Sequence, residues 1–175
     1  MKAGRLIRRF LLPRTLLSGY YLLRFGCRIS PRAEVEFNAN LRVGKGSEIG
    51  SFTKIKAGDG PLAIGRNSFI GTGCFVSAGE RGVEIGDDCL ISPQVSIISN
   101  SYRFTRLDVP IREQGSTSKG VRIGHGVWIG TGARILDGAV IGDGAIITAG
   151  TIVSGRVPPL AVFGGNPGTV IFVRR

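Results

Sequence analysis

Isoleucine, leucine or valine recurs at six-residue intervals along most of this 175-residue chain. An interval of six fits neither a helix, with a period of about 3.6, nor the two-residue alternation of a long strand. It fits a solenoid in which each hexad supplies a short strand and a corner, so that three hexads close one triangular coil. The anchors of the repeat are Val43, Ile49, Ile55, Ile64, Ile70, Val76, Ile85, Ile91, Ile97, Ile123, Ile129, Ile135, Ile141, Ile147 and Val153.

Longer steps divide the anchors into groups of three. From Ile55 to Ile64, and again from Val76 to Ile85, the step is nine residues. We interpret each group as one coil with three extra residues at a corner, and expect residues 29–42 to begin the stack less regularly. The five expected coils are 43–60, 64–81, 85–97, 123–140 and 141–158.

The position within the hexad predicts the environment of a side chain. Each anchor should point inward and stack on the anchor of the next coil, about 4.8 Å away. Glycine usually follows the anchor, where we expect a tight corner to strain a Cβ. The fifth position takes a small side chain and is predicted to be buried. It is occupied by Thr53, Ser68, Cys74, Cys89, Val95, Val127, Ala133, Ala139, Ala145 and Thr151.

The net charge of +11 is concentrated near the N-terminus. Residues 1–33 hold eight basic residues and no acidic one, and residues 34–175 hold fifteen basic and twelve acidic residues. Basic and aromatic residues do not alternate in the repeats as on a nucleic-acid stacking platform, so no nucleic-acid partner is expected. The three cysteines show neither a disulfide framework nor metal-ligand spacing, which favours a reducing compartment.

The first 28 residues form a basic, apolar N-terminal arm. Arginines and Pro13 interrupt its apolar runs, so it does not resemble a helix that spans a membrane. Two short amphipathic helices on an anionic membrane surface would explain its composition. A helix that caps the open first coil would also explain it, and the two interpretations are compatible. A targeting peptide is the weaker alternative.

The downstream half carries the most specific motifs: IG-x-x-VWIG, GDGAII-x-AG-x-IV, a VPP turn and a final G-x-P-x-x-VI. They resemble the sugar and polysaccharide acetyltransferases of the hexapeptide-repeat superfamily, similar to maltose and galactoside acetyltransferases. The stretch LDVPI-x-x-QG resembles the subgroup found with surface-polysaccharide genes. The resemblance covers residues from about 43 to 173 and implies an all-β fold, a left-handed parallel β-helix.

This resemblance implies a homotrimer that transfers an acetyl group from acetyl-CoA, without a metal, to a hydroxyl or amino group of a sugar. Surface-polysaccharide or glycolipid biosynthesis in the cytoplasm is the expected setting, with the N-terminal arm (residues 1–25) at the inner membrane face. The expected β-helix domain is 29–175, with an inserted loop at 98–122 and a C-terminal tail at 159–175.

The catalytic base is the point at which the sequence departs from these relatives. Their inserted loop supplies a histidine, which alignment places at Tyr102 or, in an earlier position, at Asn100, and the loop here contains no histidine. A phenol with an ordinary pKa of about 10 is a poor base near neutrality. His125, the only histidine, is the third catalytic candidate and is otherwise a solvated corner residue.

The resemblance also suggests binding residues. Glu80 and Ser101 are candidates for the acceptor sugar. Thr131, Ala149 and Ser154 match positions that bind CoA, and Trp128 could pack against its pantetheine arm. Lys119 and Arg156 are candidate partners of the nucleotide phosphates. For each of these residues an ordinary solvated or packed surface role is the alternative.

One alternative function stays open, and another is disfavoured. The missing histidine favours a catalytically silent β-helix that serves as a scaffold or binding module. A β-helix carbonic anhydrase would need three histidines around zinc, and this chain has one.

Overall fold

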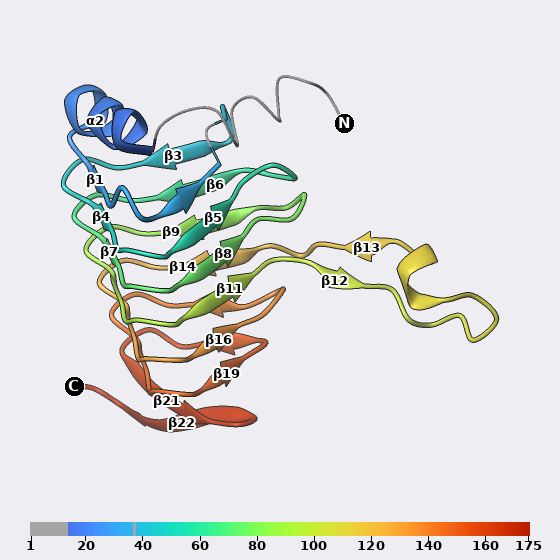
Figure 1. Cartoon of the computed structure of the whole chain (residues 1–175). Helices are drawn as coiled ribbons and strands as arrows, with labels where there is room; N and C mark the ends of the chain where they lie inside the picture. Colours follow the sequence, from blue (N-terminus) through green and yellow to red (C-terminus); the bar gives the residue numbers. More distant parts are fainter. Residues whose placement is uncertain (1–13, 37) are drawn as a thin grey trace.

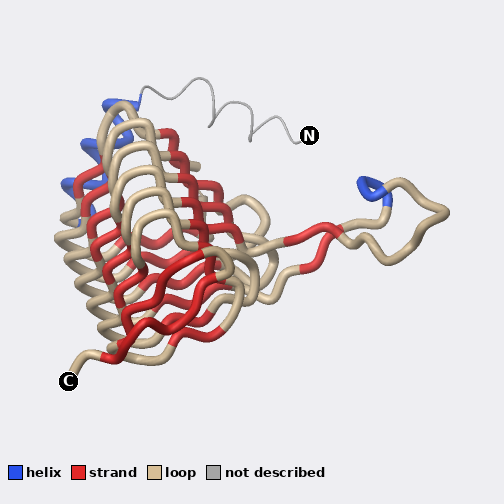
Figure 2. Tube along the Cα trace, turned by 90° about the horizontal axis from the view of Figure 1, so that it is seen from below, coloured by secondary structure: helices blue, strands red, loops and turns tan. Residues whose placement is uncertain are grey.

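The computed structural model describes residues 14–36 and 38–175. Short strands wind into a three-sided stack of coils (Figure 1), and a view turned by 90° shows these strands aligned in columns (Figure 2). Within each column the strand number advances in steps of three along most of the stack, so each coil gives one strand to each face. Stacked strands pair in parallel, as Leu90–Ile91 does with Phe69–Ile70. The expected parallel β-helix is confirmed.

We name the three faces A, B and C. Face A consists of β1 (Arg28–Ile29), β4 (Glu48–Ile49), β7 (Phe69–Ile70), β10 (Leu90–Ile91), β15 (Trp128–Ile129), β18 (Ile146–Ile147), β21 (Ala161–Gly165) and β22 (Gly168–Val173). Face B consists of β2 (Glu34–Val35), β5 (Lys54–Lys56), β8 (Phe75–Ser77), β11 (Ser96–Ile98), β16 (Arg134–Ile135) and β19 (Ile152–Val153). Face C consists of β3 (Leu41–Val43), β6 (Leu62–Ile64), β9 (Val83–Ile85), β14 (Val121–Ile123), β17 (Val140–Ile141) and β20 (Arg156–Val157).

The core is a column of anchor side chains. All the predicted anchors are buried, and Ile70, Ile91 and Ile129 lie in register on face A. The ten small side chains predicted at the fifth position are also buried. Burial of one isoleucine contributes about 1.5–3 kcal/mol, so this column is the main source of stability. Residues 29–42 are more regular than expected, because they supply strands to all three faces.

Glycine follows the anchor for a different reason from the one expected. A Cβ on Gly65 would lie 2.5 Å from the carbonyl carbon of Gly86 in the next coil. The left-handed residues come two positions later, as at Asn67 (φ 52°) and Gly126 (φ 61°). The corner-strain explanation is therefore wrong: the close approach of the neighbouring coil excludes a side chain there.

Helix α2 (Arg14–Phe25) lies over the open end of the first coil (Figure 1). Tyr21 is buried, Leu17 packs against the core, and the Cys27 thiol donates to the Tyr21 carbonyl oxygen over 3.7 Å. Burial, with smaller contributions from Cys27 and Tyr20, raises the pKa of Tyr21 to about 12. The capping interpretation is thus confirmed for α2, whereas the helix expected before it lies outside the described residues. No helix in residues 14–36 or 38–175 is long and apolar enough to cross a membrane.

The other end of the stack is also closed by secondary structure. Residues 159–175, expected as a tail, supply β21, which pairs with β18, and β22, which folds back antiparallel on β21. The Arg174 guanidinium donates to the Gly144 carbonyl oxygen and fixes the end of this segment.

The inserted loop spans residues 99–120 and projects sideways from the corner between faces B and C (Figures 1 and 2). Strands β12 (Ser101–Tyr102) and β13 (Ser116–Thr117) pair antiparallel, and the 3-10 helix η1 (Ile111–Glu113) lies near the tip. The Gln114 amide nitrogen donates to the Arg106 and Val109 carbonyl oxygens over 2.7 and 2.8 Å, respectively. The tip therefore has internal hydrogen bonds of its own.

Candidate active site at the base of the inserted loop

The loop base, residues 99–101 and 118–120, is bonded to the coil on its N-terminal side. The Gly79 N–H donates to the Ser99 hydroxyl over 2.8 Å, and the Arg81 N–H donates to the Ser118 hydroxyl over 3.0 Å. The Ser118 hydroxyl in turn donates to the Ser99 carbonyl oxygen over 2.6 Å. These bonds hold the two residues that flank Glu80, so the turn that carries this carboxylate is fixed against both strands of the loop.

Asp137 holds the loop base from the coil on the C-terminal side. One of its carboxylate oxygens accepts the backbone N–H of Lys119 over 2.8 Å and that of Gly120 over 3.0 Å. The Gly138 N–H donates to the Gly120 carbonyl oxygen over 2.8 Å. The Lys119 stem lies beside Gly138, where a Cβ would come within 3.1 Å of it. Both ends of the inserted loop are therefore fixed by hydrogen bonds to neighbouring coils.

Four predicted site residues meet at this corner. Glu80 and Lys119 are exposed on the two sides of the loop base, and Asn100 is half-buried between the Gly79 turn and Ser101. The segments that carry this carboxylate, ammonium, amide and hydroxyl are held at the same corner by hydrogen bonds of their neighbours. Such groups can accept from and donate to the hydroxyls of a sugar. Tyr102 is the next residue after the loop base. It lies in the projecting ribbon formed by β12 and β13, and its side chain is exposed.

Ser154 and Arg156 lie at the same corner, farther toward the C-terminal end. The Val140 N–H donates to the Gly155 carbonyl oxygen over 3.1 Å, and Arg156 pairs in register with Val140 on face C. Both predicted residues are exposed. They therefore stack with Asp137 and the loop base along one edge of the molecule.

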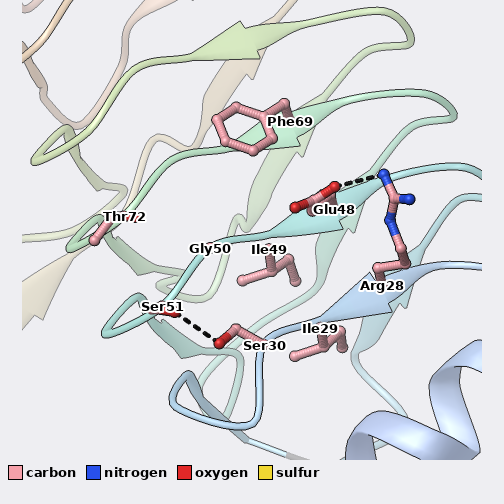
Figure 3. A pocket seen from close by; sticks show the side chains of 9 residues that line it. All are labelled: Arg28, Ile29, Ser30, Glu48, Ile49, Gly50, Ser51, Phe69 and Thr72. Atoms are coloured by element: carbon pink, nitrogen blue, oxygen red, sulfur yellow. Dashed lines mark hydrogen bonds and ion pairs between the residues drawn. The ribbon is translucent and has the colours of Figure 1, made fainter.

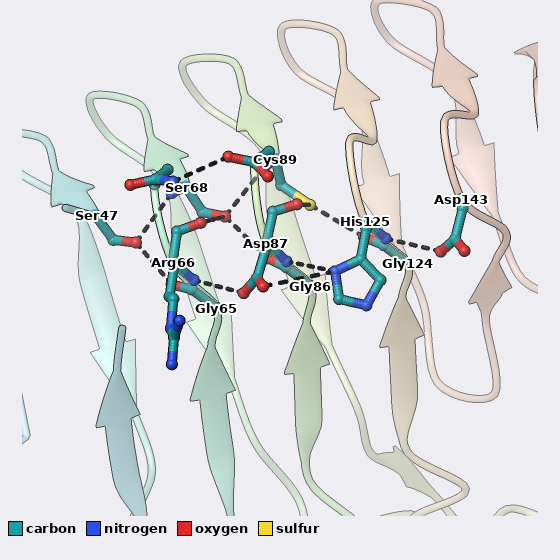
Figure 4. A network of polar contacts seen from close by, with 12 residues as sticks. Ser47, Gly65, Arg66, Ser68, Gly86, Asp87, Cys89, Gly124, His125 and Asp143 are labelled. Carbon is teal, nitrogen blue, oxygen red and sulfur yellow. Dashed lines mark hydrogen bonds and ion pairs between the residues drawn. The ribbon is translucent and has the colours of Figure 1, made fainter. Parts of the chain in front are cut away.

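His125 lies at a different corner, between faces C and A, and Figure 4 shows it in a row of side chains. The Asp87 N–H donates to His125 Nδ1 over 3.0 Å, and the His125 N–H donates to Asp143 Oδ1 over 2.8 Å. The Arg66 N–H donates to Asp87 Oδ1 over 2.7 Å in the same way. His125 thus takes the structural place of an aspartate, and face C separates it from the loop base.

The remaining predicted residues lie on face A and at the corner between faces A and B. Trp128 on β15 is 46% exposed, and its indole N–H donates to the Ser92 hydroxyl over 3.2 Å. Thr131 and Ala149 are stacked neighbours, since the Gly150 N–H donates to the Thr131 carbonyl oxygen over 2.9 Å. One chain therefore brings together the loop-base group but not His125, Trp128, Thr131 and Ala149.

Ser99, Ser118 and Asp137 were not predicted as site residues, although their hydrogen bonds fix the loop base. Asp137 is the second residue after the anchor Ile135 and precedes a glycine. This pattern is typical of corners in general. Asp137 holds the loop base only because the inserted loop rejoins the β-helix in the neighbouring coil. The two serines lie just inside the insertion and carry no motif of their own.

A shallow pocket of about 340 Å³ lies elsewhere, on face A of the first three coils (Figure 3). Arg28 and Glu48 form an ion pair of 2.6 Å at one side, and the Phe69 ring lies next to Glu48 on the following coil. Ser30 and Ser51 share a hydrogen bond of 2.9 Å at the side away from Arg28. None of the predicted site residues lines this pocket.

The cysteines are structural in their described setting. Cys74 and Cys89 donate to the carbonyl oxygens of Ser92 and Gly124 over 3.2 and 3.1 Å, respectively, and burial raises the pKa of both thiols. In the part of the chain that the structure describes, no three His, Cys, Asp or Glu side chains are grouped to hold a metal ion.

Two protein-family models match separate segments of the chain. Residues 120–155 match the bacterial transferase hexapeptide model, described as six repeats. Residues 61–93 match a model of the hexapeptide repeat of succinyl-transferase. No curated protein sequence gives a significant match.

Solved structures share the fold over most of the chain. AntD, an N-acyltransferase from Bacillus cereus in complex with dTDP and 3-hydroxybutyryl-CoA, is 23% identical, with a TM-score of 0.75 over 86% of this chain and 81% of that one. The polySia-specific acetyltransferase NeuO is 28% identical, with a TM-score of 0.55 over 84% and 71% of the two chains.

A third structure is the hexapeptide-repeat acetyltransferase VCA0836 from Vibrio cholerae O1 biovar eltor, complexed with acetyl-CoA. It is 24% identical, with a TM-score of 0.59 over 98% of this chain and 83% of that one. The repeat models and the shared architecture agree with the motifs of the sequence. The fold is the left-handed parallel β-helix, two segments match hexapeptide-repeat models of transferases, and the expected resemblance to that superfamily is confirmed.

Proposed function

We propose that this protein is an acetyl-CoA-dependent acyltransferase that modifies a sugar in surface-polysaccharide or glycolipid biosynthesis. The observation that carries the proposal is the fixed loop base, where hydrogen bonds hold the segments that carry Glu80, Asn100, Ser101 and Lys119 at one corner. The likeness to AntD, NeuO and VCA0836 supports the same class of chemistry.

In this reaction the acceptor oxygen or nitrogen attacks the thioester carbonyl carbon. A C–O or C–N bond forms, the C–S bond breaks, and the acceptor proton neutralises the departing thiolate. Glu80 and Ser101 would bind the acceptor, and Asn100 would orient it or donate to the oxyanion. A neutral amine is already nucleophilic and loses its proton after attack, so N-acylation suits a loop without histidine better than O-acylation does.

We assign the CoA side to the edges of the coils. Lys119 and Arg156 are exposed cations suited to the nucleotide phosphates, and Ser154 lies on the same edge. Trp128, Thr131 and Ala149 lie across the molecule from this edge. A second copy of the chain would be needed to bring the two groups to one CoA molecule.

A homotrimer would provide that second copy. The projecting loop carries exposed apolar side chains at Phe104, Leu107 and Ile111, and Leu107 is 100% exposed. An ordered loop with uncovered apolar side chains is suited to contact with a neighbouring subunit. Peripheral contact of residues 1–25 with the inner membrane face would bring the assembly to lipid-linked acceptors.

Calorimetric titration with acetyl-CoA, followed by detection of free thiol with a panel of sugars and amino sugars, tests this function. We expect saturable binding near one site per chain and thiol release with at least one acceptor. Tyr102→Phe and His125→Ala serve as companion variants. The absence of acetyl-CoA binding would overturn the proposal.

A catalytically silent scaffold or binding module is the second candidate. The specific observation in its favour is that the only histidine accepts a backbone hydrogen bond at a corner remote from the loop base. Acetyl-CoA-dependent acylation by the purified protein would exclude it.

A further inference from the structure

Face A carries an uninterrupted apolar column on its outer side. The column consists of the residues that precede the buried anchors, and the strand register stacks each one on its equivalent in the next coil. The antiparallel pair of Val162 and Phe172 extends it to the last strand. Five steps of about 4.8 Å make the column about 24 Å long. Its members are Phe69, Leu90, Trp128, Ile146, Val162 and Phe172.

Much of this column is open to solvent, and the other two faces have no counterpart. Leu90, Trp128 and Phe172 are 47%, 46% and 56% exposed, and Phe69 is also exposed. The equivalent columns on faces B and C contain no two successive apolar residues. They consist of Lys54, Phe75, Ser96, Arg134 and Ile152 on face B, and of Arg42, Ala63, Glu84, Arg122, Val140 and Arg156 on face C. A contiguous exposed apolar surface on one face of three indicates contact with another molecule.

The inserted loop presents an uncovered apolar side chain on an ordered turn. Leu107 is fully exposed, and its neighbours Arg106 and Asp108 form an ion pair of 2.6 Å with each other. The Arg106 N–H donates to the Gln114 side-chain oxygen over 3.0 Å, and the Gln114 amide donates back to the Arg106 carbonyl oxygen. The charges beside Leu107 are thus paired and its turn is closed, so the leucine is held ready for an apolar partner.

The loop and the column cannot meet within one chain, but they lie at the same level. The loop projects away from the side of the stack that carries β1, β4 and β7 of face A (Figure 1). It is inserted between β11 and β14, so its base lies in the coils that contain Leu90 on β10 and Trp128 on β15. A rotation about an axis parallel to the stack moves the loop sideways without changing its level. Such a rotation can bring the loop of one copy to Leu90 and Trp128 of another.

We propose that the loop turn at Leu107 packs on the face A column of a neighbouring copy, against Leu90 between Phe69 and Trp128. This inference deepens the homotrimer of the proposed function by naming the surface that receives the loop. The contact is heterologous, because loop and column are different surfaces, and a threefold rotation closes it into a ring. Packing of columns on one another would leave the loop uncovered, whereas the contact of loop with column covers both surfaces.

Cross-linking of cysteine variants tests the contact. Leu90→Cys/Leu107→Cys, treated with a short bismaleimide, should move from monomer to dimer and trimer on a denaturing gel. Leu90→Cys and Leu107→Cys alone should stay monomeric. The matched variant Ser96→Cys/Leu107→Cys should also stay monomeric, because Ser96 precedes an anchor on face B in the same coil as Leu90. The native cysteines are buried and should not react.

Three results of this experiment would overturn the proposal. They are a Leu90→Cys/Leu107→Cys protein that stays monomeric, cross-linking of Leu90→Cys alone, which would show that columns face one another, and equal cross-linking of the Ser96→Cys/Leu107→Cys control. Cross-linking that appears only after deletion of residues 1–13 would assign the column to that segment and would overturn it as well.

The cross-linking reaction needs no acetyl-CoA, so the inference and the proposed function can fail separately. A protein that cross-links as expected but does not bind acetyl-CoA would lose the acyltransferase function alone. A protein that binds acetyl-CoA but does not cross-link would lose the contact of loop with column alone.

The single tryptophan provides a second measure that needs no cysteine. Trp128 lies in the column, so a neighbouring loop should shield its fluorescence from quenching by acrylamide. Phe104→Ser/Leu107→Ser, which is changed only in the loop, should show stronger quenching than the parent protein. Leu160→Ser, with an exposed leucine replaced outside the loop and the column, should be quenched like the parent. Equal quenching of the parent and the loop variant would overturn the proposal.

Discussion

At the corner between faces C and A, the side chain of one coil accepts the backbone N–H of the preceding coil. Asp87, His125 and Asp143 share this role, and the imidazole can take it because an unprotonated Nδ1 is an acceptor. Histidine can therefore replace aspartate at this corner, because both side chains accept the same backbone hydrogen bond.

Substitution of His125 separates the structural role from a catalytic one. We expect His125→Asp to keep the hydrogen bond and the melting temperature. His125→Ala should lose about 0.5–1 kcal/mol, because the partly exposed Asp87 N–H turns to water. Thermal unfolding and acyl transfer of both variants check this prediction. A loss of transfer in His125→Asp at unchanged stability would make His125 the base.

Two glycines at equivalent corners should respond differently to alanine. In Gly65→Ala, the Cβ would meet the Gly86 backbone at 2.5 Å, so two coils must move apart. In Gly126→Ala, nothing lies within 4 Å of the Cβ, and only the left-handed dihedral is unfavourable. That conformation costs roughly 1–2 kcal/mol for an L-residue. Denaturant unfolding should therefore give a larger loss for Gly65→Ala, and equal losses would contradict the close-approach explanation.

At the scale of elements, attachment of α2 should depend on pH at the alkaline end. Burial raises the pKa of Tyr21 to about 12 from an ordinary value of 10.0. The folded protein then holds this proton more tightly than the unfolded chain does. The stabilisation is complete below about pH 10 and declines as the pH rises toward 12. Unfolding monitored by circular dichroism should show this decline, and Tyr21→Phe should reduce it.

The loop base should be sensitive to loss of its hydrogen bonds. Ser118→Ala removes the acceptor of the Arg81 N–H and the donor to Ser99, and Asp137→Asn weakens the hold on Lys119 and Gly120. We expect both variants to lower acyl transfer by tenfold or more while the coils remain folded. Steady-state kinetics with circular dichroism as the folding control measures this. Unchanged kinetics would show that the position of the loop base is irrelevant to turnover.

The strands were predictable because the burial of an anchor such as Ile91 follows from its position within its own hexad. The loop base was not, because its bonds join residues far apart in the sequence, such as Gly79 to Ser99 and Lys119 to Asp137. The tail was underestimated for a related reason. Its role as the last strand depends on the edge that β18 leaves open, and residues 159–175 carry no hexad pattern of their own.

At the scale of the whole molecule, assembly should depend on the inserted loop. Phe104 and Leu107 are exposed on it, and a neighbouring subunit would cover them in the proposed trimer. Phe104→Ser/Leu107→Ser should shift the mass measured by light scattering from trimer toward monomer. Leu160→Ser, at the C-terminal end, serves as the control. A trimer that persists at low concentration in the double variant would exclude the loop as its main contact.

The inserted loop also has a consequence for chain entropy. Hydrogen bonds between adjacent coils usually join residues 18 to 21 apart, as from Ser47 to Gly65 (18) or Cys74 to Thr53 (21). Across the loop the separation rises to 38, from Asp87 to His125. Doubling the length of a closed segment costs only about 0.6 kcal/mol, so the coils tolerate the extra residues easily. Lengthening or exchanging the outer part of the loop should therefore change the contact with a neighbouring subunit at little cost to the fold of the coils.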